Sequence, residues 1–323
     1  MTKQLPFFGS LILVLAAFLL LIAMPAEAAA GARHGLDVCA GVIIPSLLPF
    51  MIFSRLLAAL GVPQALARLT RPLLERLGLS PYAAAPLFLG LSGGYPVGAA
   101  SLGTLVREGV LSPAEGERML PWCNNTGPAF IVGAVGSAVF GSGQLGLGLY
   151  LCHILAALTL ALGSARRTPQ TCPPTLEAAP PRGFAQAFPD SVRDAAVATL
   201  HICAFVVFFS VLASLLRALG LLSSLALCLT RCTGAEPQFS LALLTGLLEL
   251  GSGIGAMSGL AATPGNLAMA AFLLGFGGLS VHCQTLSVLS GTNMKCARHF
   301  VGRILHGALS ALYAFLLFRL TGL

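Results

Sequence analysis

Long apolar runs separated by short polar segments make up most of this chain. The first run, Leu5 to Met24, has about the 20 residues that a helix needs to cross a bilayer. Lys3 and the small residues 26–28 resemble the flanks of a secretory signal, but the run is longer than the roughly 7 to 15 apolar residues of a signal core. We therefore expect an uncleaved transmembrane helix within residues 1–34, with a cleaved signal peptide as the alternative.

Glycine and proline interrupt several of the later runs. Residues 35–61 predict a second span that Pro45 and Pro49 kink or break, because proline lacks an amide donor. The run 83–109 is divided at Ser92–Pro96 into halves that are too short to cross a bilayer alone. This division predicts a re-entrant hairpin with its tip at the polar residues.

Two amphipathic segments flank the predicted hairpin. Residues 62–77 place leucines on one helical face and charges on another, as expected of an interfacial helix or of an ordinary amphipathic connector. Ser112–Glu115 is a capping-box sequence with proline at the first helical position, and it predicts a helix that Gly127-Pro128 breaks. Further helices are expected over 129–140 and 145–162, the second of them a membrane span.

The composition indicates a membrane protein. Apolar residues make up 56% of the chain and charged residues 9%, against about 25% charged in ordinary soluble domains. The net charge of +7 comes from 18 basic residues scattered between the apolar runs, so we assign them to helix ends and short loops and expect no nucleic-acid binding. The nine cysteines include no CxxC pair, so the sequence predicts neither a zinc site nor a disulfide framework.

A proline-rich, charged segment divides the chain into two unequal halves. Basic residues outnumber acidic ones around it, so we expect residues 164–190 to form a cytoplasmic linker. The halves are then residues 35–163 and 191–323.

Weak similarity connects the two halves. Leu89–Gly98 resembles Leu247–Gly255, and Gly127–Gly133 resembles Asn266–Gly275. We interpret these pairs as a pseudo-repeat, while a shared bias toward alanine, glycine and leucine is the alternative. Paired broken segments in two halves indicate a transporter's binding site.

Glu249 lies within the apolar part of the second half, where a carboxylate is costly enough to suggest a function. We expect it to serve the solute or a coupling ion, and a protonated or arginine-paired structural carboxylate is the alternative. Breaks at Gly94 and Gly251 predict half-helix N-termini whose free amides would attract an anion.

Polar residues at the breaks complete the candidate site. Two adjacent amides, Asn124 and Asn125, are hard to satisfy in lipid, although hydrogen bonding between helices is the alternative. The expected substrate-binding residues are Ser92, Gly93, Gly94, Tyr95, Asn124, Asn125, Thr126, Gly251, Ser252, Gly253 and Gln284. Glu249 and His282 are the expected coupling or proton sites, and His153 is interpreted as structural.

Several motifs occur in an order that is typical of a known family. They are Ile44–Phe50, Ser92–Ala99, Cys123–Gly136, Glu249 with its following glycines, and Phe276–Gln284. In these motifs the chain resembles the YlbJ-like sporulation integral membrane proteins of the nucleoside recognition, or Gate, domain superfamily. The resemblance covers most of the chain. It implies an all-α polytopic membrane protein with two inverted, pseudo-symmetric Gate repeats, each with a re-entrant hairpin and a broken helix.

The resemblance further implies movement of dipicolinate during sporulation. We favour translocation of a small polar or anionic solute by alternating access, without catalysis. A nucleoside-type transporter and a non-transporting membrane component required for spore assembly are the alternatives. No spacing of acid, base or metal-ligating residues supports an intramembrane enzyme built on His282 or Cys283.

The expected partners are the small-molecule solute and the lipid bilayer, with a homo-oligomer as a further expectation. We expect no cofactor and no bound metal, with Na+ or H+ as the candidate coupling ion. The expected location is the bacterial cell membrane, as a multi-pass protein, or the forespore membrane.

Overall fold

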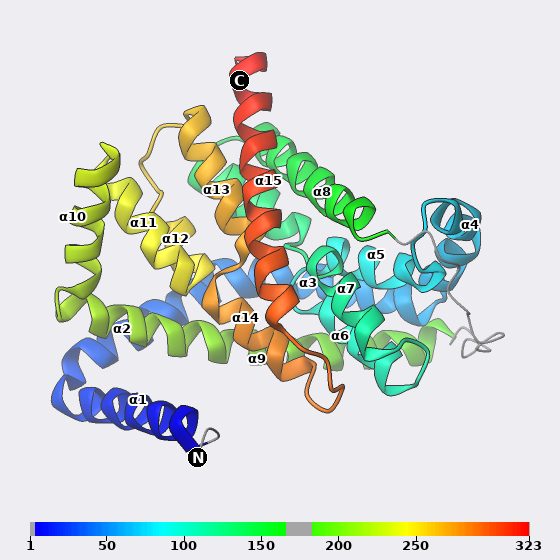
Figure 1. The fold of residues 1–323 in the computed structure, drawn as a ribbon, viewed down its shortest axis with the longest axis horizontal. Coiled ribbons are helices and arrows are strands. Elements are labelled where there is room, and N and C mark those ends of the chain that lie inside the picture. Colours follow the sequence, from blue (N-terminus) through cyan, green and yellow to red (C-terminus); the bar gives the residue numbers. More distant parts are fainter. Residues whose placement is uncertain (1–3, 166–182, 323) are drawn as a thin grey trace.

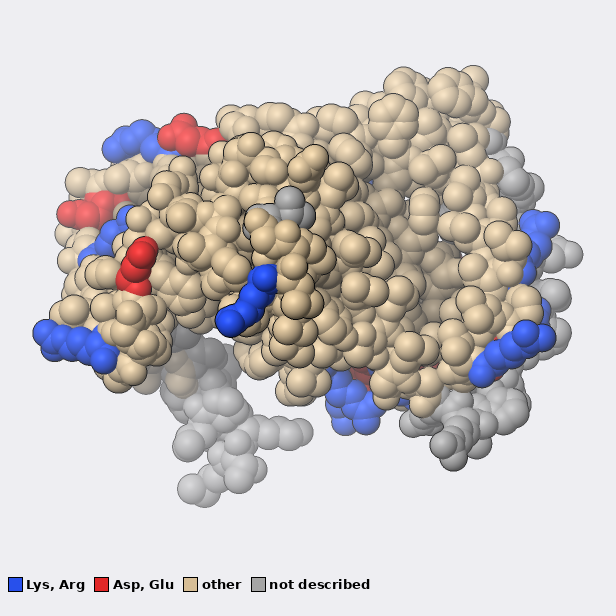
Figure 2. Space-filling view, turned by 90° about the horizontal axis from the view of Figure 1, so that it is seen from above, with Lys and Arg blue, Asp and Glu red and all other residues tan. Residues whose placement is uncertain are grey.

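A computed structural model describes residues 4–165 and 183–322, and helices account for almost all of them (Figure 1). In this described part, five helices are long and apolar enough to cross a membrane: Pro25–Ala59, Gly143–Gly163, Phe184–Ala218, Pro264–Val288 and Ala297–Thr321. Figure 2 shows charged side chains gathered toward the two ends of one face, with a broad surface almost free of charge between them. Contact with lipid requires such a surface, because charged side chains are costly inside a bilayer. The prediction of an all-α polytopic membrane protein is confirmed.

The N-terminal region is helical as expected, but its divisions differ from the prediction. Its elements are α1 (Gln4–Ala23), α2 (Pro25–Val38), the π-helical η1 (Cys39–Ile43) and α3 (Ile44–Ala59). The chain bends at Met24, and the predicted boundary at residue 34 falls inside α2. Pro45 and Pro49 do not break the span. Pro45 lies in the first turn of α3, just after the π-helical turn, where a missing amide donor is tolerated, and Pro49 lies inside α3.

The long helix α9 (Phe184–Ala218) packs along α2 and α3 (Figure 1). A Cβ added to Gly31 would lie 2.8 Å from Cα of Val211, and one added to Gly35 would lie 2.8 Å from Cα of Val207. Small residues four positions apart let two membrane helices approach this closely. Since α9 begins at Phe184, residues 184–190 of the predicted linker are helical, while 166–182 lie outside the described residues.

The first half contains the predicted hairpin. Its helices are α4 (Val62–Arg76), η2 (Pro81–Ala83), α5 (Ala84–Gly93), α6 (Val97–Arg107), α7 (Pro113–Cys123), the π-helical η3 (Ala129–Val139) and α8 (Gly143–Gly163). Helices α5 and α6 pack against each other, and the tip between them is buried. Helix α4 leaves Leu69 and Leu73 exposed, as an amphipathic helix beside a membrane would. The break between α7 and η3 falls at the predicted Gly127-Pro128.

The capping box at the start of α7 is formed as predicted. Ser112 Oγ accepts a hydrogen bond from the Glu115 amide at 3.3 Å, and the Glu115 carboxylate accepts one from the Ser112 amide at 2.9 Å. We expect Ser112→Ala to lower the free energy of unfolding by about 0.5–2 kcal/mol, measured by reversible unfolding in detergent. Ser112→Asp keeps a favoured capping residue, so an equal loss in that variant would contradict the role of the cap.

The second half repeats this order. Its helices after α9 are α10 (Leu221–Thr233), α11 (Pro237–Leu248), α12 (Leu250–Gly255), α13 (Pro264–Phe276), α14 (Gly278–Val288) and α15 (Ala297–Thr321). Helices α11 and α12 form a second hairpin, and Gly277 interrupts α13 and α14 as residues 124–128 interrupt α7 and η3. The predicted pairing of Gly127–Gly133 with Asn266–Gly275 is wrong, because the first segment follows a break and the second precedes one. Shared alanine and glycine content produced that similarity.

Candidate functional site

The tip of each hairpin touches the break of the broken helix that follows it. A Cβ added to Gly94, at the first tip, would lie 3.1 Å from the amide nitrogen of Gly127. A Cβ added to Gly278, at the second break, would lie 2.7 Å from the carbonyl oxygen of Gly246 in α11. Both glycines have positive φ, so a side chain there would be strained as well as crowded. Each of these backbone contacts joins a hairpin to the broken helix of its own half.

A cavity of about 50 Å³ lies between these segments and is large enough to hold water. Five predicted site residues line it: Tyr95, Thr126, Glu249, Gly251 and Gln284. The other lining residues are Gly127 and the apolar Ile43, Leu47, Phe130, Ile202, Val206, Leu250 and Val281. The site is therefore an apolar pocket with a few polar groups contributed by both halves, as is typical of small-molecule sites.

Glu249 caps the short helix α12. Its carboxylate accepts hydrogen bonds from the amides of Gly251 at 2.9 Å and Ser252 at 2.5 Å, and its side chain is buried. The predicted half-helix N-terminus at Gly251 is therefore not free to attract an anion, because the preceding carboxylate already occupies its amides. Sequence spacing did not reveal this, since glutamate is not a favoured N-cap residue.

Two polar groups from the first half bind the C-terminal end of α13. Tyr95 Oη donates to the Leu274 carbonyl at 3.0 Å, and Thr126 Oγ1 donates to the same oxygen at 2.8 Å. The Thr126 amide donates to Nε2 of His153 at 3.2 Å, which gives His153 the structural role that was predicted. The first hairpin tip and the first break are thus fastened to the second broken helix.

Gln284 offers the cavity an acceptor. Its Nε2 donates to Ser280 Oγ at 3.3 Å, while its Oε1 has no hydrogen-bond partner in the described part of the chain. A buried polar atom without a partner is costly unless water or a ligand satisfies it. Gln284 Oε1 is thus available to a donor on a bound solute.

Asn124 and Asn125 lie behind the cavity wall. Asn124 Nδ2 donates to Thr285 Oγ1 at 2.9 Å, which joins the first break to α14. Asn125 Nδ2 donates to the Trp122 carbonyl at 2.8 Å within its own helix end. Both side chains are fully buried, and neither lines the cavity. Their contribution to solute binding stays a prediction.

The remaining predicted residues also lie outside the cavity lining. Ser92 Oγ donates back to the Phe88 carbonyl at 2.7 Å, and Ser252 Oγ lies 3.4 Å from Ser210 Oγ. Gly93 and Gly253 serve close packing, because an added Cβ would crowd a neighbouring segment at either position. His282 packs against the ring of Phe276, with 4.9 Å between centroids.

Arg303 is a buried polar residue that was not predicted as part of the site. We assigned the basic residues to helix ends and short loops, yet Arg303 is fully buried in the first half of α15. The available signal was a charge between Gly302 and Gly307 in an otherwise apolar segment, because a charge at such a place indicates function. In the described part of the chain, no three His, Cys, Asp or Glu side chains are placed to hold a metal ion.

Two helical hairpins whose tips meet the breaks of two interrupted helices define an integral, multi-pass membrane protein with the architecture of a transporter. Residues 40–165 match the Gate family model, described as nucleoside recognition. The chain is 29% identical over 329 residues to the sporulation integral membrane protein YlbJ of Bacillus subtilis (strain 168), covering 92% of this chain and 79% of YlbJ. Residues 40–165 are therefore similar to the Gate family and most of the chain is similar to YlbJ, which confirms the predicted resemblance.

Solved structures of CNTnw, a concentrative nucleoside transporter, share the fold. One variant in an outward-facing state aligns with a TM-score of 0.55 at 17% identity, covering 99% of this chain and 86% of CNTnw. A second outward-facing variant gives a TM-score of 0.52 at 15% identity, covering 97% and 84%. The relatives found are thus a sporulation membrane protein and a transporter, and neither is an enzyme by its description.

Proposed function

We propose that this protein moves a small polar solute across the membrane by alternating access, with the cavity between the two halves as its binding site. The observation that carries the proposal is the cavity itself. Both hairpin tips, the first helix break and helix α14 line it, and α14 contributes the unpartnered Gln284 Oε1. In transporters built from repeats, the site lies at such broken helices, and one repeat moves against the other around it. The fold shared with CNTnw supports the same mechanism.

Dipicolinate is the solute that the family resemblance of the sequence implied, and the description of YlbJ as a sporulation membrane protein supports a role in sporulation. The charge of the cavity lining bears on whether dipicolinate can bind. Among the described residues that line the cavity, Glu249 is the only acidic one, and none is a lysine, arginine or histidine. A dianion beside a carboxylate would need a proton or a cation to offset the repulsion. A neutral, nucleoside-type solute meets no such repulsion and is the second candidate.

Uptake into proteoliposomes tests the proposal. Radiolabelled dipicolinate and uridine would be compared with and without a proton or sodium gradient, in the wild type and in Asn124→Ala. We expect saturable dipicolinate uptake that Asn124→Ala loses. Uptake of uridine but not of dipicolinate would support the transport mechanism and show that the solute is a nucleoside rather than dipicolinate. No uptake of either solute by folded protein would favour the non-transporting spore-assembly component.

Gln284 gives a sharper test of the cavity. Gln284→Leu removes the unpartnered acceptor at nearly constant volume, so we expect KM for the transported solute to rise about 2- to 12-fold, the equivalent of one hydrogen bond. Gln144→Leu is the matched control, because Gln144 is exposed on α8. An equal change in both variants would contradict the assignment of the site.

A further inference from the structure

Arg303 joins the C-terminal ends of both broken helices. Its Nη1 lies 3.1 Å from the Pro121 carbonyl and 2.8 Å from the Asn124 carbonyl, at the end of α7. Its Nη2 donates to the Tyr95 hydroxyl and lies 3.5 Å from the Leu274 carbonyl, near the end of α13. Helix α15 packs against α7 and α13 (Figure 1). The contacts of Arg303 therefore place its guanidinium between the ends of these two helices.

The acceptors around Arg303 are helix-end carbonyls and neutral side chains rather than carboxylates. Within the described part of the chain, none of the ion pairs involves Arg303. His306 Nδ1 lies 2.8 Å from Nη1, and His306 Nε2 lies 3.2 Å from the His153 carbonyl. Since a carbonyl can only accept, His306 carries its proton on Nε2 and accepts from Arg303 through Nδ1. The buried positive charge is therefore balanced by backbone and neutral dipoles.

The C-terminal end of a helix carries a partial negative charge, and its last carbonyls have no partner within the helix. In transporters with broken helices, such ends and the unwound carbonyls beside them hold the coupling cation. Here the guanidinium of the chain itself occupies the carbonyls of both broken helices and contacts Tyr95, which lines the cavity. An arginine side chain stays charged and offers five donors in a fixed plane, so it can bridge several carbonyls at once.

We propose that Arg303 is a resident cation that takes the place of a coupling metal ion at the two broken helices. The consequence is that solute uptake does not require Na+. This consequence, unlike the assignment of Arg303 itself, rests on the proposed transport function. Arg303 acts through Tyr95 and the helix ends, and is therefore a positioning residue.

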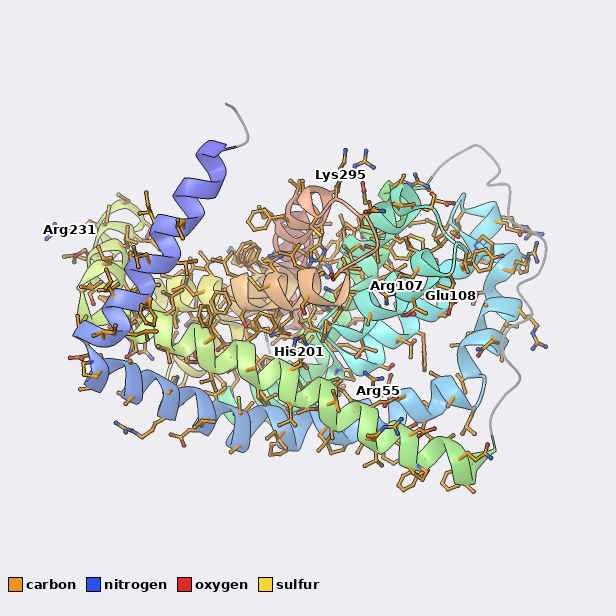
Figure 3. The ribbon with its side chains drawn as sticks, turned by 90° about the horizontal axis from the view of Figure 1, so that it is seen from below. Arg55, Arg107, Glu108, His201, Arg231 and Lys295 are labelled. Carbon is orange, nitrogen blue, oxygen red and sulfur yellow. The ribbon has the colours of Figure 1, made fainter. Side chains whose placement is uncertain are left out.

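Arg107 makes the same kind of contact in an exposed position. Its Nη1 donates to the Val288 carbonyl at 3.2 Å, at the end of α14 (Figure 3).

The first readout is the thermal stability of the purified full-length protein in sodium chloride and in choline chloride at equal ionic strength. We expect the wild type to have the same Tm in both salts, because the carbonyls are already occupied. Arg303→Met removes this donor from the buried carbonyls of Pro121 and Asn124 and should lower Tm by roughly 4–24 °C. Arg303→Ala also opens space beside the carbonyls, so Na+ should restore part of its lost Tm. Arg298→Met, an exposed change on the same helix, should leave Tm unchanged.

The second readout is uptake of the transported solute. Wild-type uptake should be equal in sodium and choline buffers, Arg303→Met should lose more than about 10-fold, and Arg303→Lys should keep part of it because an ammonium retains the charge. A wild-type Tm or uptake rate that depends on Na+ would overturn the proposal, as would an unchanged Tm in Arg303→Met. If the wild type takes up no solute, the transport function fails, but the Tm comparison still decides whether Arg303 is the resident cation.

Discussion

Replacing Gly98 by alanine is expected to lower the free energy of unfolding by about 2–4 kcal/mol, although alanine normally stabilises a helix relative to glycine. Gly98 lies in the first turn of α6, and a Cβ added there would overlap the carbonyl oxygen of Cys123. A Cβ added to Gly90 in α5 would overlap the same oxygen, so both arms of the first hairpin close on the end of α7. The colliding atom belongs to the backbone, and a rotamer change cannot relieve the overlap.

The matched control is Gly133→Ala in η3. A Cβ there meets no atom within 4 Å, so the same substitution should leave stability unchanged or raise it by up to about 1 kcal/mol. Reversible unfolding in detergent measures both variants. Because the two substitutions are expected to change the free energy of unfolding in opposite directions, the comparison distinguishes backbone crowding from helix propensity. A stabilised Gly98→Ala would show that α7 and the first hairpin are not in contact as described.

Replacing Glu249 by alanine is expected to abolish uptake and to destabilise the second hairpin. The variant leaves the buried amides of Gly251 and Ser252 without their acceptor, and each unpaired donor costs about 1–3 kcal/mol. The expected loss is therefore about 2–6 kcal/mol of unfolding free energy. Since α12 forms one side of the cavity through Leu250 and Gly251, the solute site is lost with it. Unfolding in detergent and uptake into proteoliposomes measure the two effects.

Two variants separate capping from charge. Glu249→Asp retains a carboxylate that favours the N-cap position, so we expect most of the stability to remain. Glu236 stands at the N-cap of α11 but is exposed and makes no capping hydrogen bond, so Glu236→Ala should change neither stability nor uptake. A stable Glu249→Ala without uptake would assign Glu249 to the solute or to a coupling ion alone, as first predicted from its depth in the apolar run.

Glu249 and Arg303 both form hydrogen bonds with backbone groups that would otherwise be unpaired, at opposite ends of helices. Glu249 satisfies the first amides of α12, and Arg303 satisfies the last carbonyls of α7 and α13. Breaking a helix inside a membrane protein exposes such groups, which must be satisfied internally where water is absent. Both side chains therefore stabilise helix ends beside the cavity.

The sequence by itself determined the membrane class, the first hairpin with its tip at Ser92–Pro96, the capping box at Ser112 and the break at Gly127-Pro128. These features follow from local causes: the length of an apolar run, the missing donor of proline and the spacing of a cap. The sequence also identified five of the residues that line the cavity, because polar groups beside helix breaks are rare in apolar segments.

Only the tertiary structure decided which partner each buried polar group has. Asn124 meets Thr285 across 161 positions of the chain, and Arg303 meets the carbonyl of Asn124 across 179. No spacing rule predicts such pairs, because they depend on how α7, α13 and α15 pack together. The amides at Gly251 gave the expectation of an anion site for a different reason. Glu249 caps them from two and three positions away, and this local cap was missed because glutamate is not a favoured N-cap residue.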